Sequence, residues 1–320
     1  NDPVVATQNG DSGDEGTELS GGRVYFTSTD QNGDYRVGDL FKIEQATGTA
    51  TLNADAFDLS GLVELQLGSI GASIGSTVNE FSTDEMPKHV AIIRDGNGRW
   101  AQQQGKNRLR GHEAGAKAVR KTVEAAAKLG IKHLTLYAFS TENWKRPKVE
   151  VATLMALLVR NLRRELERMT KNNIRLSAIG SLDKLPNKVR HELIEVIEKT
   201  QSNTGTNLTL ALSYGAREEI KQAVIDISKK VKNSIINVES IDETIINEHL
   251  YTQHLPDVDL LIRTSGEVRI SNFLLWQIAY AELYFTDVMW PEFDEHELQQ
   301  AIKSYLKRER RFGKTSEQLT

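Results

Sequence analysis

Cysteine is absent from the 320-residue sequence. The chain therefore has no disulfide framework and no thiolate zinc site, and this composition fits a reducing compartment. The sequence also lacks any run of roughly eighteen uncharged apolar residues, which a membrane-spanning helix requires. Its first residues, NDPVV, contain neither an initiator methionine nor a basic segment followed by an apolar core, so no secretory signal is visible. We expect a cytoplasmic protein.

Basic residues are scarce in the first part of the chain. Residues 1–85 hold 3 basic and 15 acidic side chains, a balance of −12, whereas residues 86–320 hold 37 and 29, a balance of +8. A basic second part suits an anionic partner such as a nucleic acid, a phosphorylated metabolite or an acidic membrane surface. The change in charge predicts two parts, 1–85 and 86–320, that meet at Met86-Pro87-Lys88.

The acidic first part has little that points to chemistry. Residues 1–22 are rich in Gly, Asp, Ser and Thr, which predicts a disordered or linker segment. Beyond them, alternating runs and Asn/Gly/Asp punctuation predict small hairpins, with strands at Arg23–Ser28, Tyr35–Ile43 and Gly48–Leu52 and a turn at Gln31–Asp34. The runs Gly22–Ile43 and Ala46–Gly61 faintly resemble segments of phage tail fibres and other virion structural proteins. With no histidine and no polar cluster, this part receives no predicted activity.

The second part alternates strands with long amphipathic helices. The predicted strands are His89–Asp95, His133–Phe139, Asn173–Gly180, Leu208–Tyr214 and Asp257–Thr264. The predicted helices are Glu113–Leu129, Val149–Lys171, Asn187–Gln201, Arg217–Lys232 and a last one from an Asp294 N-cap to Arg311. This alternation predicts an α/β fold with a mostly parallel sheet covered by helices on both faces. Ligands of such sheets bind outside the carboxyl ends of the strands.

The first of these strand ends carries an acidic residue, two glycines and several cations. Gly96 and Gly98 let the backbone approach a ligand closely, and the next segment can direct N–H groups at an anion. Asp95 would repel a phosphate bound there unless a Mg²⁺ ion lay between them. A cationic set that suits a diphosphate follows in the sequence: Arg99, Arg108, Arg110 and His112.

Two further segments add polar groups to an otherwise apolar region. The strand ending at Phe139 is followed by Ser140, Asn143 and Arg146. The end of the last predicted strand and the segment after it carry a second anion cradle of Arg263, Arg269 and Ser271. Glu282 lies in the apolar run Ala281–Phe285, where a carboxylate is costly unless it pairs or binds a cation. Two anion sites, metal carboxylates and apolar walls suggest transfer between two isoprenoid diphosphates.

A dinucleotide site is the alternative that the glycines raise. Gly96–Ala101 matches G-x-G-x-x-A, but the fingerprint needs a second strand soon after the helix with an acidic residue at its tip. Here the next strand begins only near His133. A P-loop is excluded because G-x-x-x-x-G-K-[ST] does not occur. The hypothesis of a nicotinamide-dependent oxidoreductase therefore depends only on the short motif Gly96–Ala101.

Residues 86–320 resemble cis-prenyltransferases, in particular undecaprenyl diphosphate synthases. The similarity lies in the blocks His89–Ile93, Asp95–Ala101, Tyr137–Pro147, Leu261–Trp276, Ala279–Phe285 and Arg308–Phe312, which occur in the expected order and spacing. The resemblance implies a six-stranded parallel sheet, a hydrophobic tunnel for the growing chain and a homodimer. It also implies peripheral contact with the inner face of the membrane during product release and no nucleic-acid partner.

The resemblance assigns roles by position. Asp95 would hold Mg²⁺, with Glu282 completing the metal site, from the neighbourhood of a partner subunit as one option. The allylic substrate, farnesyl diphosphate by analogy, would be bound by Gly96, Gly98, Arg99, Trp100, Arg108 and His112. Arg263, Arg269 and Ser271 would hold isopentenyl diphosphate. The reacting centre would be shaped by Asn97, Phe139, Ser140, Asn143, Trp144 and Arg146.

The chain departs from the family pattern beside its central aspartate. Arg94 stands where the family normally has methionine, and strand alternation directs it to the face opposite Asp95. An unpaired charge in a helix-covered layer is costly, so we expect Arg94 to lower stability or activity, through misplacement of Asp95 or a competing ion pair. Ser213 and Ala216 replace Asn and Gly of the family. The alternative to an active enzyme is a catalytically impaired or non-catalytic fusion that retains the fold.

Overall fold

The computed structural model describes residues 16–20, 23–29, 35–44, 49–52 and 85–311. The chain divides into two compact units, Asn1–Glu80 and Phe81–Thr320. The turn predicted at Gln31–Asp34 and most of residues 1–22 lie outside the described residues.

The described strands of the first unit form an antiparallel sheet in chain order: β1 (Gly16–Ser20), β2 (Arg23–Thr29), β3 (Tyr35–Glu44) and β4 (Thr49–Leu52). The three strands predicted here are confirmed. The prediction of disorder was wrong for Gly16–Ser20, which pairs along its whole length with β2. Backbone hydrogen bonds to a neighbouring strand order this segment in spite of its few apolar side chains.

The second unit contains a six-stranded sheet in the order β10-β9-β5-β6-β8-β7. Its strands are β5 (His89–Ile93), β6 (His133–Ser140), β7 (Arg175–Ile179), β8 (Asn207–Tyr214), β9 (Leu260–Arg263) and β10 (Glu282–Phe285). Every pairing is parallel. The predicted α/β class and the parallel sheet are confirmed, and β5 lies near the centre between β9 and β6.

Seven helices accompany this sheet within the described residues. They are α2 (Asn97–Gln103), α3 (Arg108–Lys128), α4 (Lys148–Lys171), α5 (Asn187–Thr200), α6 (Ala216–Lys232), α7 (Glu243–His249) and α8 (Glu295–Leu306). The predicted N-cap is confirmed, because the Asp294 side chain accepts hydrogen bonds from the backbone of His296 and Glu297. The short elements α2, α7 and β10 were not recognised individually, since four to seven residues carry little periodic signal.

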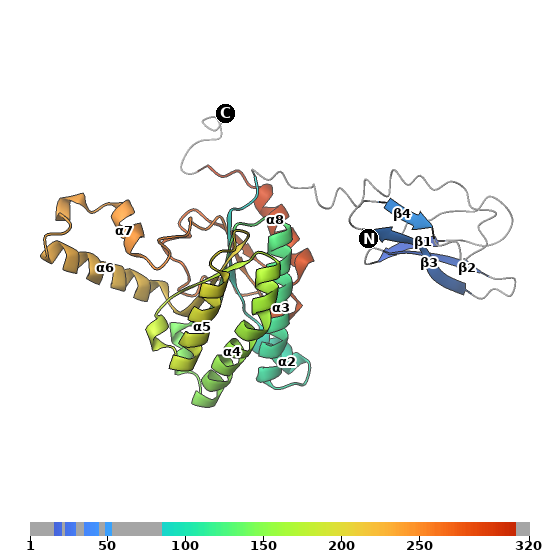
Figure 1. The fold of residues 1–320 in the computed structure, drawn as a ribbon, viewed down its shortest axis with the longest axis horizontal. Coiled ribbons are helices and arrows are strands. Elements are labelled where there is room, and N and C mark those ends of the chain that lie inside the picture. Colours follow the sequence, from blue (N-terminus) through green and yellow to red (C-terminus); the bar gives the residue numbers. More distant parts are fainter. Residues whose placement is uncertain (1–15, 21–22, 30–34, 45–48, 53–84, 312–320) are drawn as a thin grey trace. The chain divides into compact units, whose positions relative to one another are not determined.

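Helices cover the sheet on both faces, and the strand residues alternate between them. Val90 and Ile92 of β5 pack in the layer built with α3, α4, α5 and α8, whereas Ala91 and Ile93 pack in a second layer that includes Ala216 of α6. Figure 1 shows α3, α4 and α5 running side by side, with α6 and α7 extending away from them. Arg94 and Asp95, which follow β5, are thereby directed toward different layers.

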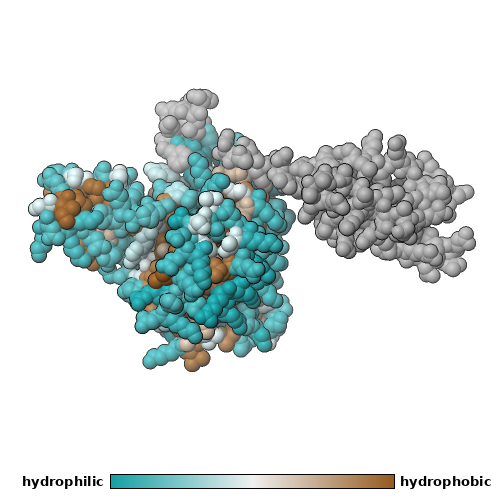
Figure 2. Space-filling model, viewed as in Figure 1, coloured by the Kyte–Doolittle hydropathy of each residue, from teal (hydrophilic) through white to brown (hydrophobic). Residues whose placement is uncertain are grey.

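Apolar side chains are also exposed on the extension formed by α6, α7 and the turn between them. Figure 2 shows brown surface gathered there. Val224 is 58% exposed, Ile235 68% and Val238 57%. No helix in the described part of the chain is long and apolar enough to cross a membrane.

Candidate active site

Asp95 lies at the carboxyl edge of the sheet, directly after β5. One of its carboxylate oxygens accepts a hydrogen bond from Arg263 Nη2 at 2.8 Å, and the other accepts one from the Gly96 backbone at 2.7 Å. Thr264 Oγ1 donates to the Asp95 carbonyl at 2.7 Å and accepts from its backbone N–H at 2.9 Å. The β5 and β9 strand ends therefore fix both the backbone and the side chain of Asp95.

Arg263 connects Asp95 to the loop after β9. Its side chain is only 4% exposed, and its Nη1 donates to Ser271 Oγ at 2.6 Å and to the Arg269 carbonyl. The Nε of Arg263 is buried with no partner among the described groups. A guanidinium held in this way keeps the predicted second cradle next to the predicted metal ligand.

Glycines bring α2 and α3 unusually close together. Gly96 has a φ of 102°, which favours glycine, and a side chain there would meet Ser265. A Cβ added to Gly111 would lie 1.9 Å from the Asn97 carbonyl oxygen. A Cβ added to Gly98 would lie 3.1 Å from the Arg108 guanidinium. The backbone at the start of α2 therefore lies directly against the Arg108 guanidinium, a cation that suits an anionic ligand.

A cavity of about 770 Å³ opens at this edge of the sheet. Most of the predicted site residues line it, namely Asp95, Gly96, Asn97, Gly98, Arg99, Arg108, His112, Phe139, Ser140, Asn143, Arg146, Arg263 and Ser271. We call the polar part formed by these residues the mouth. Arg108 in the mouth and Arg94, which also lines the cavity, have no carboxylate partner within the described residues, so this end of the cavity attracts anions.

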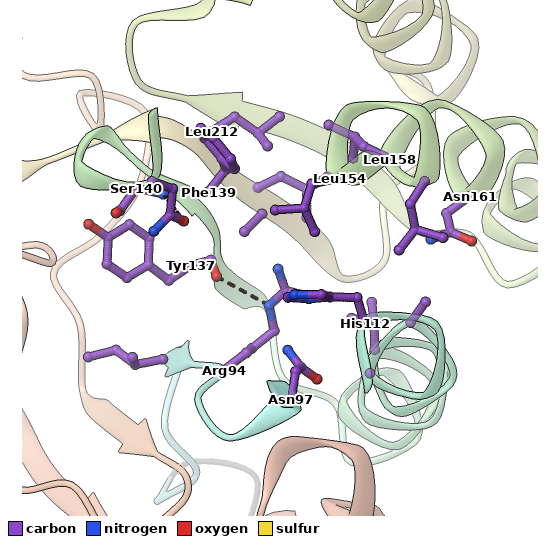
Figure 3. A pocket seen from close by; sticks show the side chains of 18 of the residues that line it. Arg94, Asn97, His112, Tyr137, Phe139, Ser140, Leu154, Leu158, Asn161 and Leu212 are labelled. Carbon is purple, nitrogen blue, oxygen red and sulfur yellow. Dashed lines mark hydrogen bonds between the residues drawn. The ribbon is translucent and has the colours of Figure 1, made fainter. Parts of the chain in front are cut away.

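Beyond the mouth, the cavity continues as an apolar channel between the sheet and α4. Its walls include Leu212, Leu210 and Leu208, which lie on one face of β8. On α4 the lining runs from Leu154 to Met169, which at about 1.5 Å per residue spans about 22 Å. Figure 3 shows the apolar side chains of Leu154, Leu158 and Leu212 close to the labelled polar residues of the mouth. The cavity therefore joins an anion site to a long hydrophobic channel.

His112 of α3 lies where the mouth meets the channel. Its Nε2 is buried with no partner among the described groups. Burial first, and then the nearby guanidinium groups of Arg146, Arg94 and Arg108, lower the pKa of His112 from 6.5 to about 4, against an opposing effect of Glu150. The imidazole is consequently neutral at neutral pH, with one nitrogen free to bond a ligand.

Arg94 extends into the same region, on the face opposite Asp95 as predicted. Its Nε donates to the Tyr137 carbonyl at 3.3 Å, and its guanidinium lies 5.7 Å from the centre of the Trp290 ring. Burial lowers the pKa of Arg94 to about 10. The expected competing ion pair was wrong, because Asp95 pairs with Arg263 and Arg99 and not with Arg94.

The turn after β6 places the predicted polar groups of the reacting centre. Asn143 Oδ1 accepts a hydrogen bond from the Ser140 backbone at 3.1 Å. Trp144 packs edge-on against Phe139, and its indole N–H donates to Ser213 Oγ at 2.9 Å. Ser213 has a φ of 47°, a conformation that asparagine adopts more readily than serine.

Some predicted substrate contacts lie away from the cavity. Trp100 donates its indole N–H to Glu292 at 2.9 Å and contacts Lys106. Arg269 is an exposed residue that pairs with Glu267 at 2.5 Å. Neither residue lines the cavity, and neither does Trp144. A substrate bound in the cavity of a single chain would therefore not make the predicted contacts with Trp100, Arg269 or Trp144.

Glu282 lies far from Asp95 in the folded chain. It begins β10 beside Leu260, which in turn lies beside Val90 of β5. Asp95 follows Val90 by five residues, about 16 Å along the strand at about 3.3 Å per residue. Glu282 pairs instead with Arg308 at 2.7 Å. The predicted pairing of Asp95 and Glu282 at one metal within one chain was therefore wrong, because the two residues lie at opposite ends of their strands.

Glu267 is a carboxylate near Asp95 that sequence reasoning missed. It accepts a hydrogen bond from Arg99 at 3.0 Å and pairs with Arg269, whose guanidinium lowers the pKa of Glu267 most, while Asp95 opposes that shift. The signal for it was available, since Glu267 stands between two predicted anion-binding residues in the loop after β9.

The donor set suits a metal that shares its ligands with a substrate. Within the described residues, no three His, Cys, Asp or Glu side chains converge on a common point. Mg²⁺ is usually held by one or two carboxylates together with substrate phosphates and water. Asp95, 35% exposed at the mouth, fits that mode of binding, whereas an all-protein cage is not formed.

Comparisons with known proteins agree with this geometry. Residues 93–313 match the family described as "Putative undecaprenyl diphosphate synthase". An isoprenyl transferase of Chlorobaculum tepidum is 52% identical over 73% of this chain and 88% of its own length. A farnesyl-diphosphate-specific undecaprenyl diphosphate synthase of Vibrio parahaemolyticus is 52% identical over 74% of this chain and 94% of its own length.

Solved structures show the same fold. Lavandulyl diphosphate synthase of Lavandula x intermedia, in complex with dimethylallyl diphosphate, superposes with a TM-score of 0.71 at 38% identity. The match covers 72% of this chain and all of that one. A probable undecaprenyl diphosphate synthase of Campylobacter jejuni gives 0.60 at 38% identity, over 71% of this chain and 99% of the other. The chain therefore belongs to the undecaprenyl diphosphate synthase family of prenyltransferases.

Proposed function

We propose that the chain condenses isopentenyl diphosphate units onto an allylic diphosphate, with farnesyl diphosphate as the first acceptor, to make a long polyprenyl diphosphate. The observation that carries the proposal is the cavity itself, in which a cationic mouth opens directly into an apolar channel. The mouth suits a diphosphate and the channel suits a hydrocarbon chain that grows away from it. The relatives in Vibrio, named as specific for farnesyl diphosphate, support this choice of acceptor.

The geometry supplies binding and charge stabilisation. The backbone of Gly96–Gly98 together with Arg99 and Arg108 would hold the allylic diphosphate, and the loop bearing Ser271 would hold the second diphosphate. The allylic C–O bond breaks with its electron pair on the departing diphosphate. The double bond of isopentenyl diphosphate then forms the new C–C bond, and the proton released from the new unit passes to the departing oxyanion. Guanidinium groups placed before the reaction stabilise the charge that develops on that diphosphate.

Mg²⁺ would be held by Asp95 and by oxygens of the bound diphosphate. When bound, it would supply a Lewis acid that stabilises the departing diphosphate. Asp95 itself is oriented by Arg263 and by the Gly96 backbone, so its charge is already in place before substrate arrives.

We propose that the active enzyme is a homodimer. We also propose that it contacts the inner face of the membrane peripherally when product is released. Isolated monomers rarely keep large apolar patches exposed, and the α6–α7 extension exposes several, as Figure 2 shows. Association between copies would cover part of this surface. Sedimentation of the purified chain as a monomer at micromolar concentration would contradict it.

The direct test of function is product formation. Incubation with farnesyl diphosphate, labelled isopentenyl diphosphate and Mg²⁺ should transfer label into butanol-extractable material, and EDTA should abolish the transfer. Deletion of residues 1–85 should leave the activity unchanged if the first unit is an appendage. No extractable label under any Mg²⁺ concentration would contradict the proposal and favour a non-catalytic role.

The deep end of the channel is expected to set product length. Leu208 lies at the start of β8 and lines the cavity. In Leu208→Phe the larger ring should shorten the product by one or more isoprene units, because the chain meets it before reaching full length. Leu298→Phe is the matched control, since Leu298 is fully buried in α8 and does not line the cavity. Chain-length analysis that shows the same product distribution in both variants would contradict the prediction.

A further inference from the structure

Arg94 is a cation at the junction of the mouth and the channel that no part of the proposed chemistry uses. It lines the cavity, and no carboxylate pairs with it within the described residues. An uncompensated charge at a partly buried position is costly. An anion that enters the cavity and meets the guanidinium would lower this cost.

Two contacts hold the guanidinium in place. Its Nε donates to the Tyr137 carbonyl at the end of β6, and its flat face lies over the buried ring of Trp290. Trp290 is anchored in turn by a hydrogen bond from its indole N–H to the Gly115 carbonyl at 2.9 Å. These contacts use one donor and one face, so the two Nη groups remain available to a ligand in the cavity.

The surroundings favour an anionic ligand over a second protein carboxylate. Figure 3 shows Arg94 extending from the strand end toward His112 of α3, with Tyr137 on its other side. The unpartnered His112 Nε2 lies in the same part of the cavity, and Arg108 approaches from above Gly98. Arg94 on the sheet side and Arg108 on α3 thus present donors to one space, which the unpartnered His112 Nε2 also lines.

We propose that Arg94 is an additional diphosphate-binding residue, which contacts the allylic diphosphate from the channel side. The inference rests on the proposed function for the identity of that ligand. Arg94 would then contact the diphosphate headgroup, whereas an apolar side chain at this place in the wall would contact the hydrocarbon tail. The chain should therefore bind a bare diphosphate tightly relative to an uncharged prenyl alcohol.

The test compares binding of inorganic pyrophosphate and of farnesol to the full chain by calorimetry, apart from any turnover. Arg94→Met should weaken pyrophosphate binding at least about tenfold, since hydrogen bonds to charged groups contribute about that much, and should strengthen farnesol binding. Arg94→Gln keeps the length of the side chain without its charge and should weaken pyrophosphate binding similarly. Arg175→Met is the control, because it removes the same charge from an exposed position that does not line the cavity.

Unchanged or tighter pyrophosphate binding in Arg94→Met or Arg94→Gln would overturn the assignment. Combined with a higher melting temperature, that result would make Arg94 a destabilising substitution of the wall. If the parent chain binds pyrophosphate but forms no prenyl product, the proposed function fails while the Arg94 assignment stands.

Discussion

Asp95→Asn is expected to reduce turnover roughly a thousandfold, which is the scale of loss when an enzyme loses a group that stabilises charge in the transition state. The carboxylate is 35% exposed at the mouth, where Mg²⁺ and a diphosphate would meet. Asparagine keeps the shape and an oxygen that accepts the Gly96 N–H, but it lacks the charge that attracts the metal. The measurement is steady-state transfer of labelled isopentenyl diphosphate.

Binding of pyrophosphate separates this loss of charge from a loss of fold. Without Mg²⁺, Asp95 repels an anion bound at the start of α2, so Asp95→Asn should bind pyrophosphate as tightly as the parent chain or more tightly. With Mg²⁺, the parent should gain affinity and the variant should not. Asp287→Asn serves as the control, because Asp287 is exposed and does not line the cavity. Retention of more than about a tenth of the parent's turnover would contradict a central role for Asp95.

The cationic mouth could be predicted from the sequence because its residues lie at the carboxyl ends of parallel strands. Ser140 and Arg263 end their strands and Asp95 lies just beyond the end of its strand, and parallel strands bring their carboxyl ends to one edge. The structure brings these three residues to one cavity. The same rule explains why the prediction for Glu282 was wrong. Glu282 is the first residue of β10 and so lies at the opposite edge of the sheet, and the sequence pattern did not show that a strand begins there.

The apolar channel could not be predicted from the residues at the strand ends. Leu154, Leu158 and Leu162 repeat with a helical period that predicts a buried face of α4. Whether that face meets the sheet or leaves a cavity depends on how α3, α4 and β8 are spaced, which no local pattern records. The sequence indicated apolar walls near the anion sites, and the family resemblance implied a tunnel for the growing chain, but neither predicted which residues line it.

Trp100 shows a different limit. Its place beside the anion-binding glycines suggested contact with substrate, but α2 turns its side chain toward Glu292. A helix changes the direction of successive side chains by about 100°, so neighbours in sequence do not share a face. Arg94 illustrates the opposite case, since alternation in a strand placed it correctly on the face away from Asp95.

Acid is expected to destabilise the second unit through His89, a buried histidine outside the active site. His89 is 1% exposed; its Nδ1 donates to the Pro256 carbonyl at 2.7 Å, and its Nε2 accepts from Thr135 Oγ1 at 2.7 Å. Burial lowers its pKa from 6.5 to about 4. One pKa unit corresponds to about 1.4 kcal/mol, so the difference is worth roughly 3 kcal/mol of folding free energy.

The sign follows from which state binds the proton. Between pH 4 and 6.5 the unfolded chain is protonated at His89 and the folded chain is not, so stability rises with pH across this window. The contribution is complete above about pH 6.5 and is lost as the pH falls toward 4. Urea unfolding of His89→Gln should show a flatter pH dependence in this window than the parent chain, whatever its stability at pH 7. His191→Gln, at an exposed position, should keep the parent's slope, and equal slopes for the parent and His89→Gln would show that His89 does not control acid stability.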